Sequence, residues 1–325
     1  MKYLLNTSTD PYFNLSFDEY CLEHLSSEDS VFYLWRNRPA VIVGLNQNVY
    51  SEVNLDYLRQ NGVVLARRVT GGGAVYHDLQ NLNYTIIGRK PSPEPILQAL
   101  RSLGVDAELS GRNDIFVDGR KVSGYARRVW QDREMIHGTL MYDVDIDALV
   151  HSLDVDGSKL SAKGVASVRS RVCNLKDYLP RISGIEELKA RLQEILADGD
   201  GELTLSQEAL DEVRKNAENK FASWDWIYGR SRGGGFHASR RLPCGTVDVN
   251  LSLDHARISD IGFSGDFIGN SPASALEADL LGTKYGRDEV LSVINAHSIE
   301  NIFPGASPEE ITDLITSSAS PRCGQ

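Results

Sequence analysis

The sequence predicts an α+β protein with a large first domain and a smaller second one. A chain of 325 residues is long enough for about two domains. Short apolar, β-branched runs gather before residue 142 and helical patterns gather after residue 184, which is the segregation typical of α+β folds. Three consecutive glycines, Gly233 to Gly235, show no periodicity and predict a linker. We therefore expect domains at 1–230 and 236–325.

Local signals predict each element of the first domain. Asp10 followed by Pro11 predicts the start of a helix, and Gly62 predicts the end of a shorter one. Asp118-Gly119 is the strongest two-residue hairpin signal, and Asn37-Arg38-Pro39 also predicts a hairpin. The predicted strands are Lys2–Asn6, Val31–Arg36, Ala40–Gly44, Val63–Arg67, Leu82–Ile87, Asp106–Leu109, Ile115–Val117, Lys121–Val129 and Met135–Tyr142, and the predicted helices are Pro11–Leu25, Asn54–Asn61 and Pro93–Leu103.

The rest of the chain predicts helices and then a small α+β module. From Gly184 to Phe221 the apolar residues recur with helical spacing. Beyond the linker, Thr246–Leu253 alternates like a strand, and Ile258–Phe263 is expected to pair with it. Two amphipathic helices are predicted near 272–281 and 287–297. In the helical stretch that begins at Gly184, the residues Ile185, Leu188, Leu192 and Ile195 are expected to lie on one stripe.

Composition and charge exclude several classes of protein. The net charge of −11 argues against a protein wrapped around nucleic acid. No apolar run approaches the roughly 18 residues of a membrane span. Four cysteines lie far apart without a CxxC pair, so neither a disulfide framework nor a zinc ribbon is expected. The first residues do not read as a signal peptide, and a cytoplasmic location is expected.

A glycine-rich segment between two predicted strands is the first candidate for a ligand site. Gly71 to Gly73 let backbone N–H groups approach a ligand because no Cβ stands in the way, which suits phosphate oxygens. Arg67 and Arg68 precede them and add planar cations that match phosphate or carboxylate. The segment is neither a P-loop nor a Rossmann fingerprint. A bulged hairpin with a flexible tip is the alternative interpretation.

Four further places could carry chemistry. Lys121 follows the predicted hairpin and is either a solvated strand end or a cation aimed into a cleft. Asn113 and Asp114 could hold a hard cation such as Mg²⁺, or they could form an Asx turn. His137 lies inside an apolar strand, where a packed core residue is more usual than a catalyst. The basic segment Lys163–Val172 is either functional or an exposed loop.

The order and spacing of these segments resemble the lipoate–protein ligases. The resemblance rests on ARRVTGGGAVYHDLQNLNYT, SGRNDI, GRKVSGYA, HGTL and KGVASVRSRVCNL, and also on DPYFNLSFDEYCL, LWRNRPAVIVGLNQNVYSE and WDWIYG. It covers essentially the whole chain, including the small C-terminal module of the two-domain bacterial form. The implied fold is the biotin/lipoate ligase catalytic domain, a mixed sheet with helices related to class II aminoacyl-tRNA synthetases, followed by an α+β accessory domain.

The resemblance also implies a two-step adenylation and a set of site residues. Lipoate and ATP, with Mg²⁺, would give lipoyl-AMP and pyrophosphate, and the lipoyl group would then pass to a lysine amine. The implied catalytic residue is Lys121, which would touch both substrates. The remaining implied residues are Arg68, Gly73, Ala74, Val75, Tyr76 and Lys121 for ATP, then Lys121, Arg68, Gly72, His77 and His137 for lipoate, and Asp114 for the metal ion.

The resemblance names acceptors and leaves two alternatives open. The implied acceptors are the lipoyl domains of 2-oxoacid dehydrogenase E2 subunits and the glycine-cleavage H protein. We expect a monomer that binds neither nucleic acid nor a membrane. Because cysteine-dependent octanoyltransferases share this fold, Cys173 could instead support a thioester route. The second alternative is a non-catalytic protein that binds lipoyl groups or nucleotides.

Overall fold

The chain folds into two compact units with different sheets. The structure, a computed structural model, describes residues 1–25, 30–111, 113–153, 169–197, 199, 202–229 and 236–317. The expected linker Gly233–Gly235 lies outside these residues. The first unit comprises Met1–Val43, Tyr50–Val69 and Ala74–Ile227, and the second comprises Gly44–Val49, Thr70–Gly73 and Tyr228–Gln325. Both units combine sheet and helix, which confirms the α+β class.

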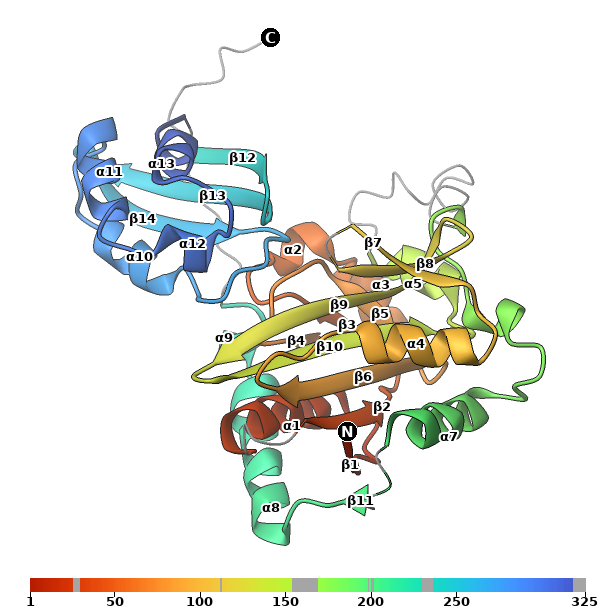
Figure 1. Ribbon diagram of the computed structural model, residues 1–325. Helices are drawn as coiled ribbons and strands as arrows, with labels where there is room; N and C mark the ends of the chain where they lie inside the picture. The colour runs from red at the N-terminus through yellow and green to blue at the C-terminus, as the bar shows by residue number, and fades with distance from the viewer. Residues whose placement is uncertain are drawn as a thin grey trace. The chain divides into compact units, whose positions relative to one another are not determined.

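The first unit contains an eight-stranded mixed sheet and a three-stranded sheet (Figure 1). The large sheet consists of β1 (Lys2–Leu4), β2 (Val31–Trp35), β6 (Asn81–Gly88), β7 (Ala107–Ser110), β8 (Asp114–Val117), β9 (Arg120–Trp130), β10 (Arg133–Met141) and β11 (Glu202–Leu203). The small sheet consists of β3 (Ala40–Val43), β4 (Val64–Arg67) and β5 (Val75–His77). The strand orders are β11-β1-β2-β6-β10-β9-β8-β7 and β4-β3-β5.

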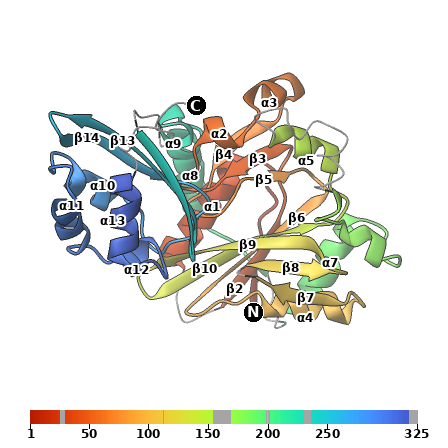
Figure 2. The ribbon, with the colours of Figure 1, turned by 90° about the horizontal axis from the view of Figure 1, so that it is seen from above.

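Helices cover the two faces of the large sheet unequally. The helices of this unit are α1 (Pro11–His24), α2 (Val49–Glu52), α3 (Leu55–Asn61), α4 (Glu94–Ser102), α5 (Ile146–Ser152), the 3₁₀ helix η1 (Leu175–Tyr178), α7 (Ile185–Leu196), α8 (Gln207–Asn216), the π-helix η2 (Ala217–Phe221) and α9 (Trp224–Ile227). Helices α4 and α7 pack on one face, whereas α1 and the small sheet pack on the other. Figure 2 shows α4 and the small sheet on opposite sides of β9 and β10. None of the helices in the described ranges is long and apolar enough to cross a bilayer.

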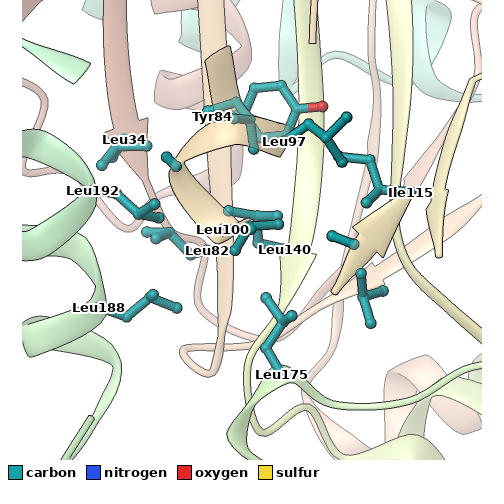
Figure 3. Close-up of a cluster of buried hydrophobic side chains, with 14 of the residues drawn as sticks. Leu34, Leu82, Tyr84, Leu97, Leu100, Ile115, Leu140, Leu175, Leu188 and Leu192 are labelled. Atoms are coloured by element: carbon teal, nitrogen blue, oxygen red, sulfur yellow. The ribbon is translucent and has the colours of Figure 1, made fainter. Parts of the chain in front are cut away.

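The larger hydrophobic core lies between the sheet and helices α4 and α7. Leu82 of β6 and Leu140 of β10 are cross-strand partners, so their side chains share this face. Leu100 of α4 and Leu188 of α7 contribute to the same buried cluster (Figure 3). All four side chains are fully buried. This face of the sheet is therefore filled by apolar packing, and polar chemistry is left to the opposite face.

The second unit is a three-stranded antiparallel sheet covered by helices. Its elements are β12 (Phe236–Leu242), β13 (Gly245–Asp254), β14 (Arg257–Ser264), α10 (Ser274–Leu280), α11 (Arg287–Ile294), α12 (Ile299–Ile302) and α13 (Pro308–Ser317). Alternate residues of β13, among them Val247, Val249 and Leu251, point into its core. The predicted pairing of the two strands after the linker is confirmed, because β13 pairs with β14.

Turn chemistry predicted some local structure correctly. Asp118 and Gly119 have φ values of 50° and 70°, the left-handed conformation that a tight hairpin requires, and they join β8 to β9. Gly62 ends α3 with φ 65°. In α7, however, the buried stripe includes Leu196, and Ile195 is 41% exposed, so the placement of Ile195 on this stripe is wrong.

The hairpin predicted at Asn37-Arg38-Pro39 is wrong. Strand β2 belongs to the large sheet and pairs with β1 and β6, whereas β3 belongs to the small sheet and pairs with β4 and β5. The side chain of Asn37 is fully buried and contacts Asn14 and His77, so this turn carries the chain between the sheets. A local turn signal does not say which strands pair.

Candidate active site

A row of residues crosses five strands on the face opposite the main core. Trp35 of β2 pairs with Asn83 of β6, and Asn83 pairs with Thr139 of β10. The N–H of Gly124 in β9 donates to Thr139 Oγ1 at 3.2 Å, and Gly124 pairs with Asp114 of β8. Because cross-strand partners point to the same face, these five residues form one line, the first row. The row has a bulky end at β2 and an acidic end at β8.

A second row runs beside the first and is anchored by a buried carboxylate. Its members are cross-strand partners, namely Tyr33, Thr85, His137 and Ala126. Asp18 of α1, which is fully buried, accepts hydrogen bonds from the Tyr33 hydroxyl at 2.6 Å and the Thr85 hydroxyl at 2.9 Å. Its other oxygen lies 2.7 Å from His137 Nδ1. The predicted His137 is thus on this face of the sheet, with its ring oriented by α1.

A β-bulge decides which face of the sheet carries Lys121. Ser123 pairs with Ile115, but Lys121 pairs with the very next residue of β8, so Val122 is an extra residue in β9. With regular alternation Lys121 would share the face of Ser123 and Ile115, which is the face of the main core. The bulge reverses this, and Lys121 Nζ lies 2.8 Å from Asp114 Oδ1 beside the first row.

The Lys121 ammonium occupies space that is open because residue 124 is a glycine. A Cβ at position 124 would lie 2.8 Å from Lys121 Nζ and 3.0 Å from its Cε. The Lys121 backbone is held on both sides, since its N–H donates to Arg171 O at 2.8 Å and its carbonyl accepts from Cys173 N at 3.0 Å. The lysine side chain is 38% exposed. A fixed and partly exposed ammonium is suited to meet an anionic substrate.

Arg68 and His77 are buried polar groups of the first unit. Arg68 donates through Nη1 to Ile42 O at 3.0 Å, and burial lowers the pKa of its guanidinium to about 10. Burial also lowers the pKa of His77 to about 3, and the neighbouring charges of Arg68 and His137 add to this effect. His77 is therefore neutral near pH 7 and acts through hydrogen bonds. Tyr76, which precedes it, has a raised pKa because it is buried.

Arg67 does not face a ligand, which corrects the expectation for the arginine pair. Its side chain is fully buried, and Nε donates to the carbonyls of Trp226 and Ile227 at 3.0 Å each. The Trp226 indole returns a bond to the Arg67 carbonyl at 2.8 Å. The guanidinium thus satisfies the carbonyls at the end of α9, groups that a helix leaves unpaired. Arg67 is a structural residue.

The glycine loop belongs to the second unit, and its three glycines have different surroundings. Gly72 has φ 91° and donates its N–H to Phe267 O at 3.4 Å. A Cβ on Gly71 would overlap the same carbonyl, whereas a Cβ on Gly73 would meet no heavy atom within 4 Å in the described parts of the chain. Strands β4 and β5 both pair with β3, which lies between them, so the bulged-hairpin interpretation is wrong. The loop continues through Ala74 into β5.

The expected metal ligand Asp114 lies beside a lysine. Its Oδ1 faces Lys121 Nζ, and the described residues gather no group of three acidic, histidine or cysteine side chains that could hold a metal ion. The role of Asp114 toward a metal ion stays a prediction. Its neighbour Arg112 and most of the basic segment, Lys163–Val168, lie outside the described residues.

Cys173 lies on the wrong face for the thioester alternative. It is 3% exposed and belongs to the core that α4 and α7 cover, opposite the ammonium of Lys121. Its Sγ contacts the carbonyl oxygens of Val117 and Arg120 at 4.0 and 3.9 Å. Burial raises the pKa of the thiol, which disfavours the nucleophilic thiolate. The geometry therefore argues against a catalytic cysteine here.

Sequence reasoning missed Asp18, although a signal for it existed. Asp18 follows Leu15 by three residues and precedes Leu22 by four, so it lies on the apolar face of its helix. An acid on an apolar helix face requires hydrogen-bond partners in the folded protein. Gly124 and the bulge at Val122 gave no such signal, because strand register depends on the partner strand.

Two family matches together cover most of the chain. The family described as "Lipoyl protein ligase A/B catalytic domain" matches residues 10–197. A second family, "Bacterial lipoate protein ligase C-terminus", matches residues 235–315. The chain belongs to the lipoate–protein ligase family.

Individual relatives are similar over nearly their whole length. "Lipoate-protein ligase LplJ" of Bacillus subtilis is 38% identical over 320 residues, which are 94% of this chain and 97% of the relative. The structure of Plasmodium falciparum LipL1 in complex with lipoate has a TM-score of 0.79 at 26% identity, covering 97% of this chain and 98% of the other. A lipoate-protein ligase A bound with ATP has a TM-score of 0.61 at 28% identity, covering 70% and 98%.

The burial of Cys173 predicts that its thiol reacts slowly in the folded protein. We expect alkylation by iodoacetamide to be slower by about two orders of magnitude in native buffer than in denaturant, because the thiolate must form inside an apolar core. Mass spectrometry of the Cys173 peptide measures both rates, and Cys173→Ser identifies the peptide. Rapid modification of native Cys173 would contradict the assignment.

Proposed function

We propose that this chain is an ATP-dependent lipoate–protein ligase that activates lipoate as lipoyl-AMP. In the first step a lipoate carboxylate oxygen attacks the α-phosphorus of ATP. The bond from that phosphorus to the bridging oxygen of the β-phosphate breaks, and pyrophosphate leaves. The observation that carries the proposal is the position of the Lys121 ammonium. The bulge places it on the polar face of the sheet, and Gly124, which has no side chain, leaves room for it. Family membership supports it.

The residues proposed for the site supply what the adenylation step requires. Carboxylate and triphosphate are both anionic, and negative charge accumulates on the non-bridging oxygens of the α-phosphate in the transition state. The Lys121 ammonium would stabilise that charge from a fixed position, which is usually the largest electrostatic contribution to catalysis. Arg68, Gly73, Ala74, Val75 and Tyr76 would bind ATP. Gly72, His77 and His137, with Arg68 and Lys121, would bind lipoate.

In the second step the amine of an acceptor lysine attacks the carbonyl carbon of lipoyl-AMP. An amide forms, AMP leaves, and the amine loses a proton. We propose lipoyl domains of 2-oxoacid dehydrogenase E2 subunits and the glycine-cleavage H protein as acceptors. We also propose a cytoplasmic monomer with a catalytic domain at 1–230 and an accessory domain at 236–325.

Mg²⁺ enters the proposal as part of the nucleotide substrate. It typically binds through nucleotide phosphates and one or two carboxylates, so it does not need a cage of protein ligands. Asp114 would be the nearest carboxylate to the Lys121 ammonium. Bound to ATP, the ion would neutralise the charge of the pyrophosphate that leaves.

Release of pyrophosphate separates the proposed function from both alternatives. A ligase releases pyrophosphate only when ATP and lipoate are both present. A thioester transferase moves an acyl group without consuming ATP, and a binding protein does neither. The measurement is pyrophosphate formed by the purified chain, with each substrate omitted in turn. Absence of release with both substrates would contradict the proposal.

Lys121→Ala is expected to lower the rate of pyrophosphate release by about 10²-fold or more, as for the loss of one preorganised charge in an active site. Lys176→Ala is the matched control, because Lys176 is also a lysine paired with an aspartate, Asp143 at 2.6 Å, but lies exposed elsewhere. The control is expected to keep the wild-type rate. Equal rates for both variants would contradict the assignment of Lys121.

Gly124→Ala is expected to lower the same rate while the fold survives. The new methyl group would occupy the place of the Lys121 ammonium, and a flexible lysine can move aside at little cost in stability. We expect about a tenfold loss of rate, the effect of one displaced charge-assisted hydrogen bond. Gly184→Ala is the control, because its Cβ enters open space. Wild-type activity in Gly124→Ala would mean that the Lys121 ammonium does not act from its position beside Gly124.

Gly73→Val is expected to weaken ATP binding by about tenfold or more, because a branched side chain would hold phosphate away from backbone donors. The described residues around position 73 leave space for a Cβ, so thermal stability should stay close to that of the wild type. Calorimetric titration with ATP measures the affinity. An unchanged affinity would make the loop a structural turn.

A further inference from the structure

Three buried asparagines form a hydrogen-bonded chain that ends on His77. Asn6 Nδ2 donates to Asn14 Oδ1 at 3.1 Å, and Asn14 Nδ2 donates to Asn37 Oδ1 at 2.8 Å. Asn37 Nδ2 then lies 3.0 Å from His77 Nδ1. All four side chains are at most 4% exposed. Asn6 lies between β1 and α1, and Asn14 lies in α1. Asn37 lies in the turn after β2, and His77 lies in β5, so the hydrogen bonds join four segments.

Backbone carbonyls fix the direction of this chain. The same amide nitrogen of Asn14 also faces Ser8 O at 3.1 Å and Arg36 O at 3.0 Å. Because carbonyl oxygens only accept, that atom must be the nitrogen and cannot be exchanged with the amide oxygen. Asn37 must then present its oxygen to Asn14, which leaves its N–H₂ group facing His77.

This direction determines the tautomer of His77. An N–H₂ group only donates, so His77 Nδ1 must accept, and the proton of the neutral ring must sit on Nε2. The titratable groups that act on the ring are Arg68, which follows β4, and His137 of β10. A positive charge on either adds to burial in disfavouring the imidazolium. Nε2 is buried and has no hydrogen-bond partner within the described residues. A buried donor without an acceptor is costly, which indicates that a ligand supplies the acceptor.

We propose that the Nε2–H group of His77 donates a hydrogen bond to an acceptor atom of the acyl substrate, and that Asn37 and Asn14 are positioning residues that set its tautomer. The inference rests on the proposed function for the identity of the substrate. It assigns a task to the Asn14 and Asn37 motifs, DPYFNL and LWRN, that adenylation chemistry does not require.

The place of His77 in the fold indicates which end of the substrate it meets. Its ring lies edge-on to Trp35 with 6.2 Å between ring centroids, at the β2 end of the first row. Lys121 is on β9, three strands away in the order β2-β6-β10-β9, which corresponds to about 14 Å at ordinary strand spacing. If the carboxylate lies at Lys121, the acceptor near His77 is a sulfur of the dithiolane ring. A carboxylate oxygen is the other acceptor that lipoate offers.

The tautomer of His77 can be measured without an assay of enzyme activity. In ¹⁵N-histidine-labelled wild-type protein, two-bond ¹⁵N–¹H correlations are expected to show His77 with Nε2 protonated and Nδ1 unprotonated, unchanged between pH 5 and 8. The spectrum of His77→Gln assigns the signal. A protonated Nδ1, or titration of His77 in that range, would overturn the proposal. This result does not depend on pyrophosphate release, so it separates the inference from the proposed function.

Asn37→Asp tests the positioning role. A carboxylate only accepts, so it would draw the proton to His77 Nδ1 and remove the donor at Nε2. We expect the KM for lipoate to rise about tenfold or more and the KM for ATP to stay within about twofold. Asn61→Asp, the same change on the exposed end of α3, is the control and is expected to match the wild type.

Octanoate identifies the acceptor, because it keeps the carboxylate and lacks the sulfurs. A loss confined to lipoate assigns the bond to sulfur, and an equal loss for both acids assigns it to the carboxylate. An unchanged KM for both acids would overturn the proposal. His77→Gln, which offers an uncharged N–H of similar reach, is expected to retain more affinity for lipoate than His77→Leu. Equal losses in these two variants would also contradict a donor role.

Discussion

The carboxylate of Asp18 holds helix α1 against three neighbouring strands of the large sheet. A charge in a dry interior is tolerated only when hydrogen bonds surround it, so Tyr33, Thr85 and His137 are tied to the position of the helix. One turn earlier on the same helix, Asn14 is hydrogen-bonded to Asn37 in the turn after β2, and Asn37 contacts His77 of β5. The orientation of the polar side chains in the second row therefore depends on where α1 lies.

The large sheet separates stability from chemistry by face. One side is filled by leucines, isoleucines and valines from the sheet, α4 and α7, and it also buries the Cys173 thiol. The other side carries hydroxyls, amides and charges in two rows. A strand alternates strictly between these faces, so a single inserted residue, Val122, is enough to move a lysine from the core side to the polar side.

Local chemistry made much of the fold predictable, and long-range register did not. The turn at Asp118-Gly119 followed from residues that accept left-handed backbone, and the buried stripe of α7 followed from helical spacing apart from one residue. The hairpin predicted at Asn37 was wrong, because the side chain of Asn37 contacts His77, forty residues away, and does not form a hairpin turn. For the site, the glycine-rich and lysine motifs named two segments whose roles toward a ligand stay predictions. The structural role of Arg67 could not be predicted, because it depends on a contact with Trp226, 159 residues further along the chain.

The pairing of Arg67 with Trp226 has an optical consequence. The indole N–H is hydrogen-bonded to the end of β4, and the Lys220 ammonium lies 4.5 Å from the centre of a Trp226 ring. A bond to the indole nitrogen and a cation over the ring both alter the energy and lifetime of the excited state. Trp226 is thus a natural fluorophore at the last turn of the first unit, and its emission reports whether α9 remains attached to the strand that leads into the glycine loop.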